Sequence, residues 1–131
     1  MSVRGLAPVG RIGRYDILGR LATGGMAEIF LARESGPHQA SRTLVVKRIL
    51  PHVAEDPEYV ESFVAEATLS LRLRHPHICT VYEFGEEAGR YFLAMEYVRG
   101  VSLHELIERV GPMPMALTVR IIADVADALT H

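Results

Sequence analysis

Cysteine, tryptophan and long apolar segments are scarce or absent in this sequence. Its single cysteine, Cys79, cannot form a disulfide within the chain, which favours a reducing compartment such as the cytoplasm. No apolar run approaches the roughly 20 residues that a membrane-spanning helix needs, and residues 1–14 lack the apolar centre of a signal peptide. These absences predict a cytoplasmic location and no membrane partner.

An excess of either charge is also missing. The 14 basic and 16 acidic residues leave a formal net charge of −2, so the basic field that attracts nucleic acid is absent. We therefore expect no nucleic-acid partner. Apolar residues, in contrast, make up 49% of the 131 residues, which is enough for the core of one domain or of part of a larger one.

Residue patterns predict an α+β fold with the element order β-β-β-α-β-β-α-α. Runs of β-branched and apolar residues bounded by turn residues favour strands, and apolar spacings of three and four residues favour helices. Residues 1–13 are rich in glycine, proline and arginine and are expected to form a flexible leader. The five strands are predicted at 15–21, 27–33, 43–49, 80–86 and 91–96.

Capping residues mark the helix boundaries. Asp56-Pro57 is a favourable helix start, and His75-Pro76 is expected to end that helix. Ser102 and Glu105 have the capping-box spacing at the start of a second, short helix. After Pro114 a last helix carries an apolar stripe, formed by Leu117, Ile121, Val125 and Ala128 with Ile122 and Leu129 at its flanks.

Lys47 is the most informative residue of the chain. It lies in the predicted strand 43–49 and shares a face with the apolar Val45 and Ile49, so its ammonium must find a negative partner, reach water or lose its charge. A glycine-containing turn precedes it at 21–29, and the helix that follows it carries Glu66. A turn that can approach phosphates, a lysine behind it and a carboxylate to hold the lysine are the parts of an ATP site.

These residues, in this order and spacing, resemble the small lobe of a protein kinase, and more closely that of bacterial serine/threonine kinases of the eukaryotic type. The resemblance covers about residues 14–131. It implies a small lobe at 14–96 with a five-stranded antiparallel sheet and one large helix. The hinge and the start of an incomplete large lobe, with two helices, would follow at 97–131.

The resemblance also assigns roles to individual residues. Lys47 and Glu66 correspond to the family's catalytic lysine and its partner glutamate, and Met95 corresponds to the gatekeeper before the hinge. The implied cofactor is ATP, with Mg²⁺ expected for the complete kinase, and no metal ligand is assigned here. The implied nucleotide-binding residues are Leu21, Ala22, Thr23, Gly24, Gly25, Met26, Ala27, Ile29, Val45, Lys47, Met95, Glu96 and Val98.

The sequence departs from the family pattern at several positions. Ala22 and Ala27 stand where the family has the first and third loop glycines, which should stiffen the loop. Val45 replaces a smaller alanine and should tighten the adenine pocket. The catalytic base and the magnesium ligands of the family would follow His131, and no His-Arg-Asp or Asp-Phe-Gly is present.

The expected function is therefore the ATP-binding portion of a protein serine/threonine kinase, which transfers the γ-phosphate of ATP to protein hydroxyls. Transfer is not expected from these residues alone. Two alternatives stay open: a non-catalytic nucleotide-binding or regulatory module that acts through protein contacts, and a truncated remnant. The apolar stripe of the last helix is also expected to promote self-association.

Polar residues outside this pattern have simpler interpretations. His75, His77 and Cys79 would share a strand face and are compatible with a metal site, but Pro76 breaks the strand and no fourth ligand is placed. Asp124 and Asp127, one helical turn apart, are expected to form a solvated face.

Overall fold

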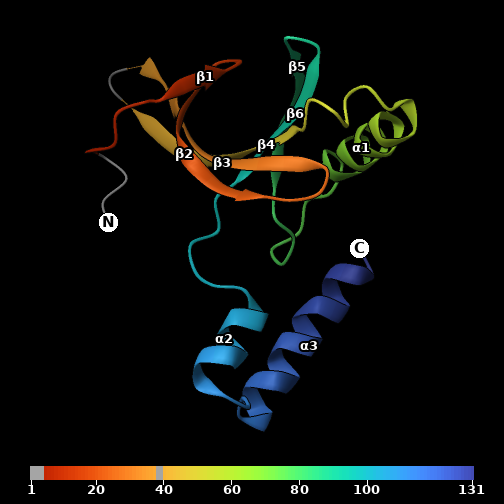
Figure 1. Ribbon diagram of the computed structural model, residues 1–131. Helices are drawn as coiled ribbons and strands as arrows, with labels where there is room; N and C mark the ends of the chain where they lie inside the picture. Colours follow the sequence, from red (N-terminus) through yellow and green to blue (C-terminus); the bar gives the residue numbers. More distant parts are fainter. Residues whose placement is uncertain (1–4, 38–39) are drawn as a thin grey trace. The chain divides into compact units, whose positions relative to one another are not determined.

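The computed structural model describes residues 5–37 and 40–131. A six-stranded antiparallel sheet has the strand order β1-β2-β3-β4-β6-β5 (Figure 1). Three helices complete the α+β fold, as predicted. The elements are β1 Gly10–Ile12, β2 Tyr15–Thr23, β3 Ala27–Ser35, β4 Ser41–Ile49, α1 Pro57–Ser70, β5 Val81–Glu87, β6 Arg90–Glu96, α2 Leu103–Val110 and α3 Met115–Leu129.

The chain divides into two compact units. The sheet unit consists of the described residues of Met1–Leu73 and Thr80–Tyr97, and contains all six strands and α1. The helical unit consists of Arg74–Cys79 and Val98–His131, and contains α2 and α3. The loop 74–79 thus belongs with the helices, although in sequence it lies between α1 and β5.

Two apolar clusters hold the sheet unit together. One lies on the sheet face lined by Tyr15, Phe30, Val46 and Phe92, which are all buried. The other joins the opposite face to α1. Burying large apolar side chains of this kind contributes about 1.5–3 kcal/mol each, so these two clusters account for most of the unit's stability. The second cluster contains Ile49, Val53, Phe63, Ala67, Val81 and Leu93.

Helix α1 begins where the sequence predicts. The Asp56 carboxylate accepts a hydrogen bond from the Glu58 N–H at 3.0 Å, and Pro57 occupies the first turn, where no N–H is required. Phe63 and Ala67, one turn apart, bury the helix against the sheet near β5 (Figure 1). The predicted end was wrong: α1 ends at Ser70, with Leu71 as C-cap, and not at His75-Pro76.

The sheet contains one strand more than the sequence predicts. Gly10–Ile12 forms β1 and pairs with β2 through Ile12 and Tyr15, so the leader predicted at 1–13 is partly structured. Ile12 is buried in the first apolar cluster. This burial explains the extra strand, because one apolar side chain that reaches the core can stabilise a short strand whose other residues are glycine and arginine. Residues 1–4 of that leader lie outside the described residues.

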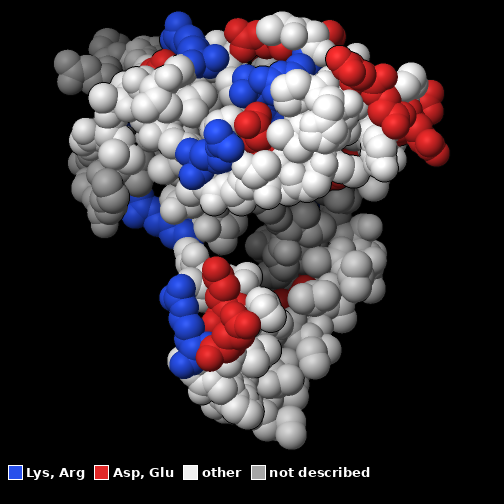
Figure 2. All heavy atoms as spheres, in the orientation of Figure 1, with Lys and Arg blue, Asp and Glu red and all other residues white. Residues whose placement is uncertain are grey.

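Charged side chains of both signs cover the sheet unit. Figure 2 shows blue and red atoms next to one another on the face in view. Several form ion pairs across strands, such as Arg42 with Glu34 at 2.7 Å. The guanidinium of Arg14 contacts both Glu34, at 3.1 Å, and Glu83, at 3.2 Å. Because the arginines of these pairs are exposed, water screens them and each pair is worth about 0–1 kcal/mol.

The helical unit has a capped start of α2 and an exposed apolar surface on α3. The Ser102 hydroxyl accepts from the Glu105 N–H, and the Glu105 carboxylate accepts from the Ser102 N–H, which confirms the predicted capping box. On α3, Leu117 is 43% exposed and Leu129 is 81% exposed. Self-association through this helix stays a prediction.

Gly85 gives a direct test of the packing in the sheet unit. A Cβ built at Gly85 would lie 2.6 Å from Cζ of Phe92, a buried ring in the first cluster. We expect Gly85→Ala to lower the free energy of unfolding by about 1–3 kcal/mol, because the ring must leave its position. Gly10→Ala, where the new Cβ meets nothing within 4 Å, is the matched control in urea unfolding. Equal stability of the two variants would contradict this packing.

Tyr15 should make the stability depend on alkaline pH. Burial raises the pKa of its phenol, and the hydrogen bond from its hydroxyl to the Glu83 carboxylate acts in the same direction. Unfolded tyrosine titrates near pH ~10. The neutral phenol is therefore favoured by folding, so stability is complete below about pH 10 and falls as the pH rises toward the folded-state pKa. Urea unfolding at pH 8 and 10.5 should show a smaller alkaline loss in Tyr15→Phe, whereas Tyr59→Phe, at a 46% exposed position, should behave as the parent.

Candidate functional site

The central contact of the candidate site is an ion pair between a strand and a helix. Nζ of Lys47, on β4, lies 3.1 Å from Oε1 of Glu66, on α1. The Lys47 side chain is 27% exposed and that of Glu66 is 55% exposed, so water screens the pair and its own contribution to stability is about 0–1 kcal/mol. The pair is better suited to orient the ammonium than to hold the fold together.

Phe63 supplies a second contact to the same ammonium. Nζ of Lys47 lies 5.9 Å from the centre of the Phe63 ring, at the outer limit of a cation–π contact. Phe63 is buried and sits one turn before Glu66 on α1. Sequence reasoning placed Phe63 only in the apolar stripe of the helix. The signal for its second role was the three-residue spacing to Glu66, which puts both side chains on the side facing β4.

Strand register collects the other predicted residues on the face of Lys47. Directly paired residues of antiparallel strands share a face, and Lys47 pairs with Ile29 on one side and Leu93 on the other. Two residues along β4, Val45 pairs with Met95 in the same way. One continuous surface is therefore lined by Ile29, Val45, Lys47 and Met95. This surface is apolar apart from the Lys47 ammonium.

The predicted glycine-containing turn joins β2 to β3 at one end of this surface. Thr23 ends β2 opposite Glu28, and the Gly24 N–H donates to the Ala27 carbonyl at 2.8 Å. The turn is also tied to β4, because the Leu50 N–H donates to the Met26 carbonyl at 2.9 Å. Leu21 and Met26 are exposed. The turn is thus fixed at its base and open at its tip.

The fold itself does not require glycine at the tip of this turn. Neither Gly24 nor Gly25 has a positive φ. A Cβ at Gly24 would make only an ordinary 3.7 Å contact, and one at Gly25 would meet nothing within 4 Å. The absence of a side chain at Gly25 leaves room for close approach of phosphate oxygens to the backbone at the tip of the turn.

On the opposite face, two arginines fix the start of β3. Arg48 and Arg90 both contact Oε2 of Glu28, at 3.3 and 3.6 Å. Burial lowers the pKa of Arg90, and the neighbouring Arg48 guanidinium adds to the effect. Arg90 also donates to the Ile49 carbonyl. This cluster holds the β3 and β4 ends together behind the turn.

The predicted gatekeeper and hinge residues are divided between the two units. Met95 packs against the second apolar cluster. The Glu96 carboxylate accepts a hydrogen bond from the Thr80 N–H at 3.1 Å, a structural role that sequence reasoning missed. Val98 belongs to the helical unit and is 64% exposed. The site described here therefore consists of residues of the sheet unit.

A cavity of about 430 Å³ lies beside the turn. Gly25 and Met26 form one wall, and the segment leading into α1 forms the rest through His52, Val53, Asp56 and Tyr59. Lys47 is not among the residues that line it. The cavity shares only the turn with the candidate site and does not replace the surface of Lys47.

Fold and residue pair together define the small lobe of a protein kinase, followed by the first helices of the large lobe. The chain belongs to the protein kinase family, since the protein kinase domain matches residues 15–131. The predicted resemblance to bacterial serine/threonine kinases is confirmed, since such kinases are among its relatives.

Similar proteins are bacterial kinases. Tyrosine-protein kinase MasK of Myxococcus xanthus is 38% identical over 121 residues, which cover 89% of this chain and 19% of MasK. Serine/threonine-protein kinase PrkC of Bacillus subtilis is 34% identical over 119 residues, which cover 91% of this chain and 18% of PrkC. The crystal structure of the Mycobacterium tuberculosis PknI kinase domain has a TM-score of 0.75 at 29% identity, and the match covers 95% of this chain and 50% of that one.

The chain thus spans about a fifth of the length of these curated relatives and half of the PknI chain. Within the described residues, no helix is both long enough and apolar enough to cross a membrane. The same residues contain no group of three or more histidine, cysteine or acidic side chains arranged to hold a metal ion.

The glycine turn gives a stability test of the site. Because the fold does not require glycine at its tip, Gly24→Ala and Gly25→Ala should leave the free energy of unfolding unchanged or raise it by up to about 1 kcal/mol. Gly89→Ala, at a φ of +75° in the β5–β6 turn, should lower it. Thermal and urea unfolding would measure all three. A large loss at Gly25 would mean that the glycine serves the fold.

Proposed function

We propose that the sheet unit binds ATP and supplies the nucleotide-binding portion of a protein serine/threonine kinase. The observation that carries this proposal is the 3.1 Å contact between Lys47 and Glu66 on the apolar surface lined by Ile29 and Val45. An apolar strand surface with one oriented cation suits a ligand that has a flat apolar base at one end and phosphates at the other.

Each residue would make one kind of contact with the nucleotide. The Lys47 ammonium would attract the α- and β-phosphates, and Glu66 would keep it pointed toward them. The backbone N–H of Gly25, at the tip of the turn, would approach the phosphate oxygens, while the Gly24 N–H stays bonded to the Ala27 carbonyl. Leu21, Ile29, Val45 and Met95 would cover the base, with the backbone at Glu96 reading its edge.

The acceptor of the phosphoryl group is a protein hydroxyl in this proposal. Mg²⁺ would neutralise phosphate charge in the complete enzyme, and none of the described residues is assigned to hold it. PrkC is named as a serine/threonine kinase, which supports that acceptor. MasK is named as a tyrosine kinase, so tyrosine is the second candidate acceptor.

Replacement of Lys47 tests the phosphate contact. We expect Lys47→Met to weaken ATP binding about 10- to 100-fold, because a charge-assisted contact to phosphate is lost, while the free energy of unfolding changes by less than about 1 kcal/mol. Glu66→Gln should weaken binding by a smaller factor. Glu61→Gln, an exposed position on the same helix, is the matched control. Isothermal calorimetry that gives the parent affinity for Lys47→Met would refute the assignment.

Lys47 is the sole lysine of the chain, which allows a chemical test. An amine-reactive adenosine analogue should modify Lys47, and excess ATP should prevent the modification. Peptide mass spectrometry separates this product from modification of the N-terminal amine. Labelling of Lys47 that ATP does not reduce, or labelling of the N-terminus alone, would count against a nucleotide site on this face.

A further inference from the structure

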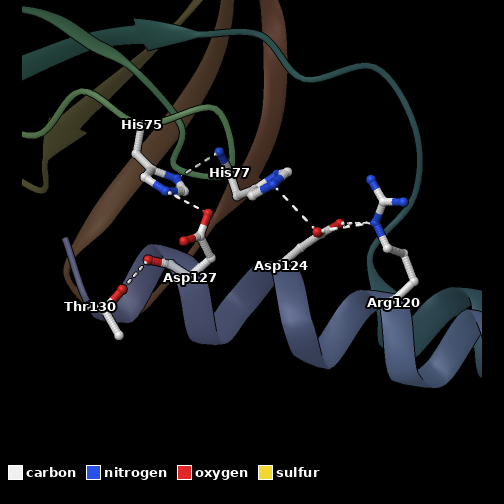
Figure 3. Close-up of polar contacts among 6 residues, drawn as sticks. All are labelled: His75, His77, Arg120, Asp124, Asp127 and Thr130. Carbon is white, nitrogen blue, oxygen red and sulfur yellow. Dashed lines mark hydrogen bonds and ion pairs between the residues drawn. The ribbon is translucent and has the colours of Figure 1, made fainter.

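The loop 74–79 is held to α3 by two histidine–aspartate contacts within the helical unit. Nε2 of His75 lies 3.1 Å from Oδ2 of Asp127, and Nε2 of His77 lies 3.4 Å from Oδ1 of Asp124 (Figure 3). The sequence predicted a solvated face for the two aspartates, and their side chains are 67% exposed at Asp127 and 33% exposed at Asp124, but it did not predict their histidine partners. Each carboxylate faces an imidazole from a distant part of the chain.

Hydrogen bonding fixes the tautomer of His75. The His77 backbone N–H donates to Nδ1 of His75 at 3.0 Å, so Nδ1 carries a lone pair and not a proton. In the neutral imidazole the proton must then sit on Nε2, which donates it to Asp127. Figure 3 shows His75 between these two partners. Neutral His75 therefore acts as an acceptor within its own loop and as a donor to α3.

Other titratable and charged groups surround this arrangement. The rings of His77 and His131 lie 5.4 and 5.3 Å from that of His75. Asp124 is shared, because Nε of Arg120 lies 3.2 Å from its Oδ1. Asp127 is therefore the carboxylate that faces His75, while Arg120 already compensates the charge of Asp124.

A second proton on His75 has opposite effects on its two contacts. On the Asp127 side it creates an ion pair, and that carboxylate is 67% exposed, so screening limits the gain. On the loop side it converts Nδ1 from an acceptor into a donor, which faces the His77 N–H. Two donors cannot share a hydrogen bond, and the His75 side chain is only 10% exposed, so water has little access to compensate.

We propose that neutral His75 holds the loop between α1 and β5 closed, and that protonation of His75 opens this loop. Neutral His75 closes the turn at residues 75–77 while it is hydrogen-bonded to α3. Protonation of His75 breaks the turn hydrogen bond and leaves the contact with Asp127 in place. The loop then opens at the His77 amide while its attachment to the helix persists.

The His77 amide is the readout that separates this proposal from a merely structural role. We expect its hydrogen-exchange protection, corrected for intrinsic rates, to fall about two- to tenfold between pH 7.5 and pH 5.5, as the loss of one hydrogen bond predicts. Amide exchange followed by NMR on the full chain, with a chelator present, would measure it. Unchanged protection would overturn the proposal, and so would a response that appears only without the chelator, since a metal would then be the ligand.

Two substitutions at one position sharpen the test. His75→Asn keeps an acceptor at the position of Nδ1 and cannot titrate in this range, so the His77 amide should stay protected at both pH values. His75→Gln lacks that acceptor and should leave the amide exposed at both. A parent-like pH response in His75→Asn would overturn the proposal by assigning the effect to other groups.

A control and an independent measurement complete the design. His104→Gln removes an exposed histidine that contacts Glu108 on α2 and should leave the response of the His77 amide unchanged. Imidazole ¹⁵N shifts of the parent at pH 7.5 report the tautomer without any substitution. A proton on Nδ1 of His75 at that pH would contradict the proposal even if the variants fail to fold.

Discussion

The candidate site depends on the packing of α1 against the sheet. Phe63 and Ala67 are buried between α1 and the sheet face that carries Ile49 and Leu93. This apolar contact fixes how the helix lies, and Glu66 comes within 3.1 Å of Lys47 as a consequence. An exposed ion pair is too weak to position a helix by itself. The chemistry of Lys47 therefore rests on a neighbouring hydrophobic contact.

The same contact explains why the pairing of Lys47 with Glu66 could be predicted from sequence. Alternation along 43–49 placed Lys47 on an apolar face, and the helical stripe that contains Phe63 oriented Glu66 toward it. Both are local patterns, and a local pattern predicts the fold correctly when the same residues are buried in the tertiary structure. The end of α1 was not predictable in this way, because no cap residue marks Ser70 and the helix stops before the proline signal.

Three other contacts between separate segments could not be predicted, because no local pattern of the sequence marks them. β1 rests on the burial of Ile12, and the Glu96 carboxylate bonds the Thr80 N–H across a gap of 16 residues. The local sequence did not predict the histidine partners of Asp124 and Asp127 either. Two aspartates one helical turn apart have the same spacing whether that side of the helix faces water or faces histidines. In each case the partner is chosen by tertiary structure, so only coordinates can identify it.

Lys47 and His75 differ in solvent exposure, and this difference decides whether a change in protonation can alter the hydrogen bonds around a polar contact. The Lys47 ammonium contacts the Glu66 carboxylate and lies near the Phe63 ring, so its geometry can serve a ligand without a switch. His75 is more buried and uses both ring nitrogens, one as acceptor and one as donor. A single proton then changes the pattern of hydrogen bonds as well as the charge, and screening by water cannot restore the lost acceptor. For this reason the histidine, and not the lysine, is the group on which pH can act as a structural signal.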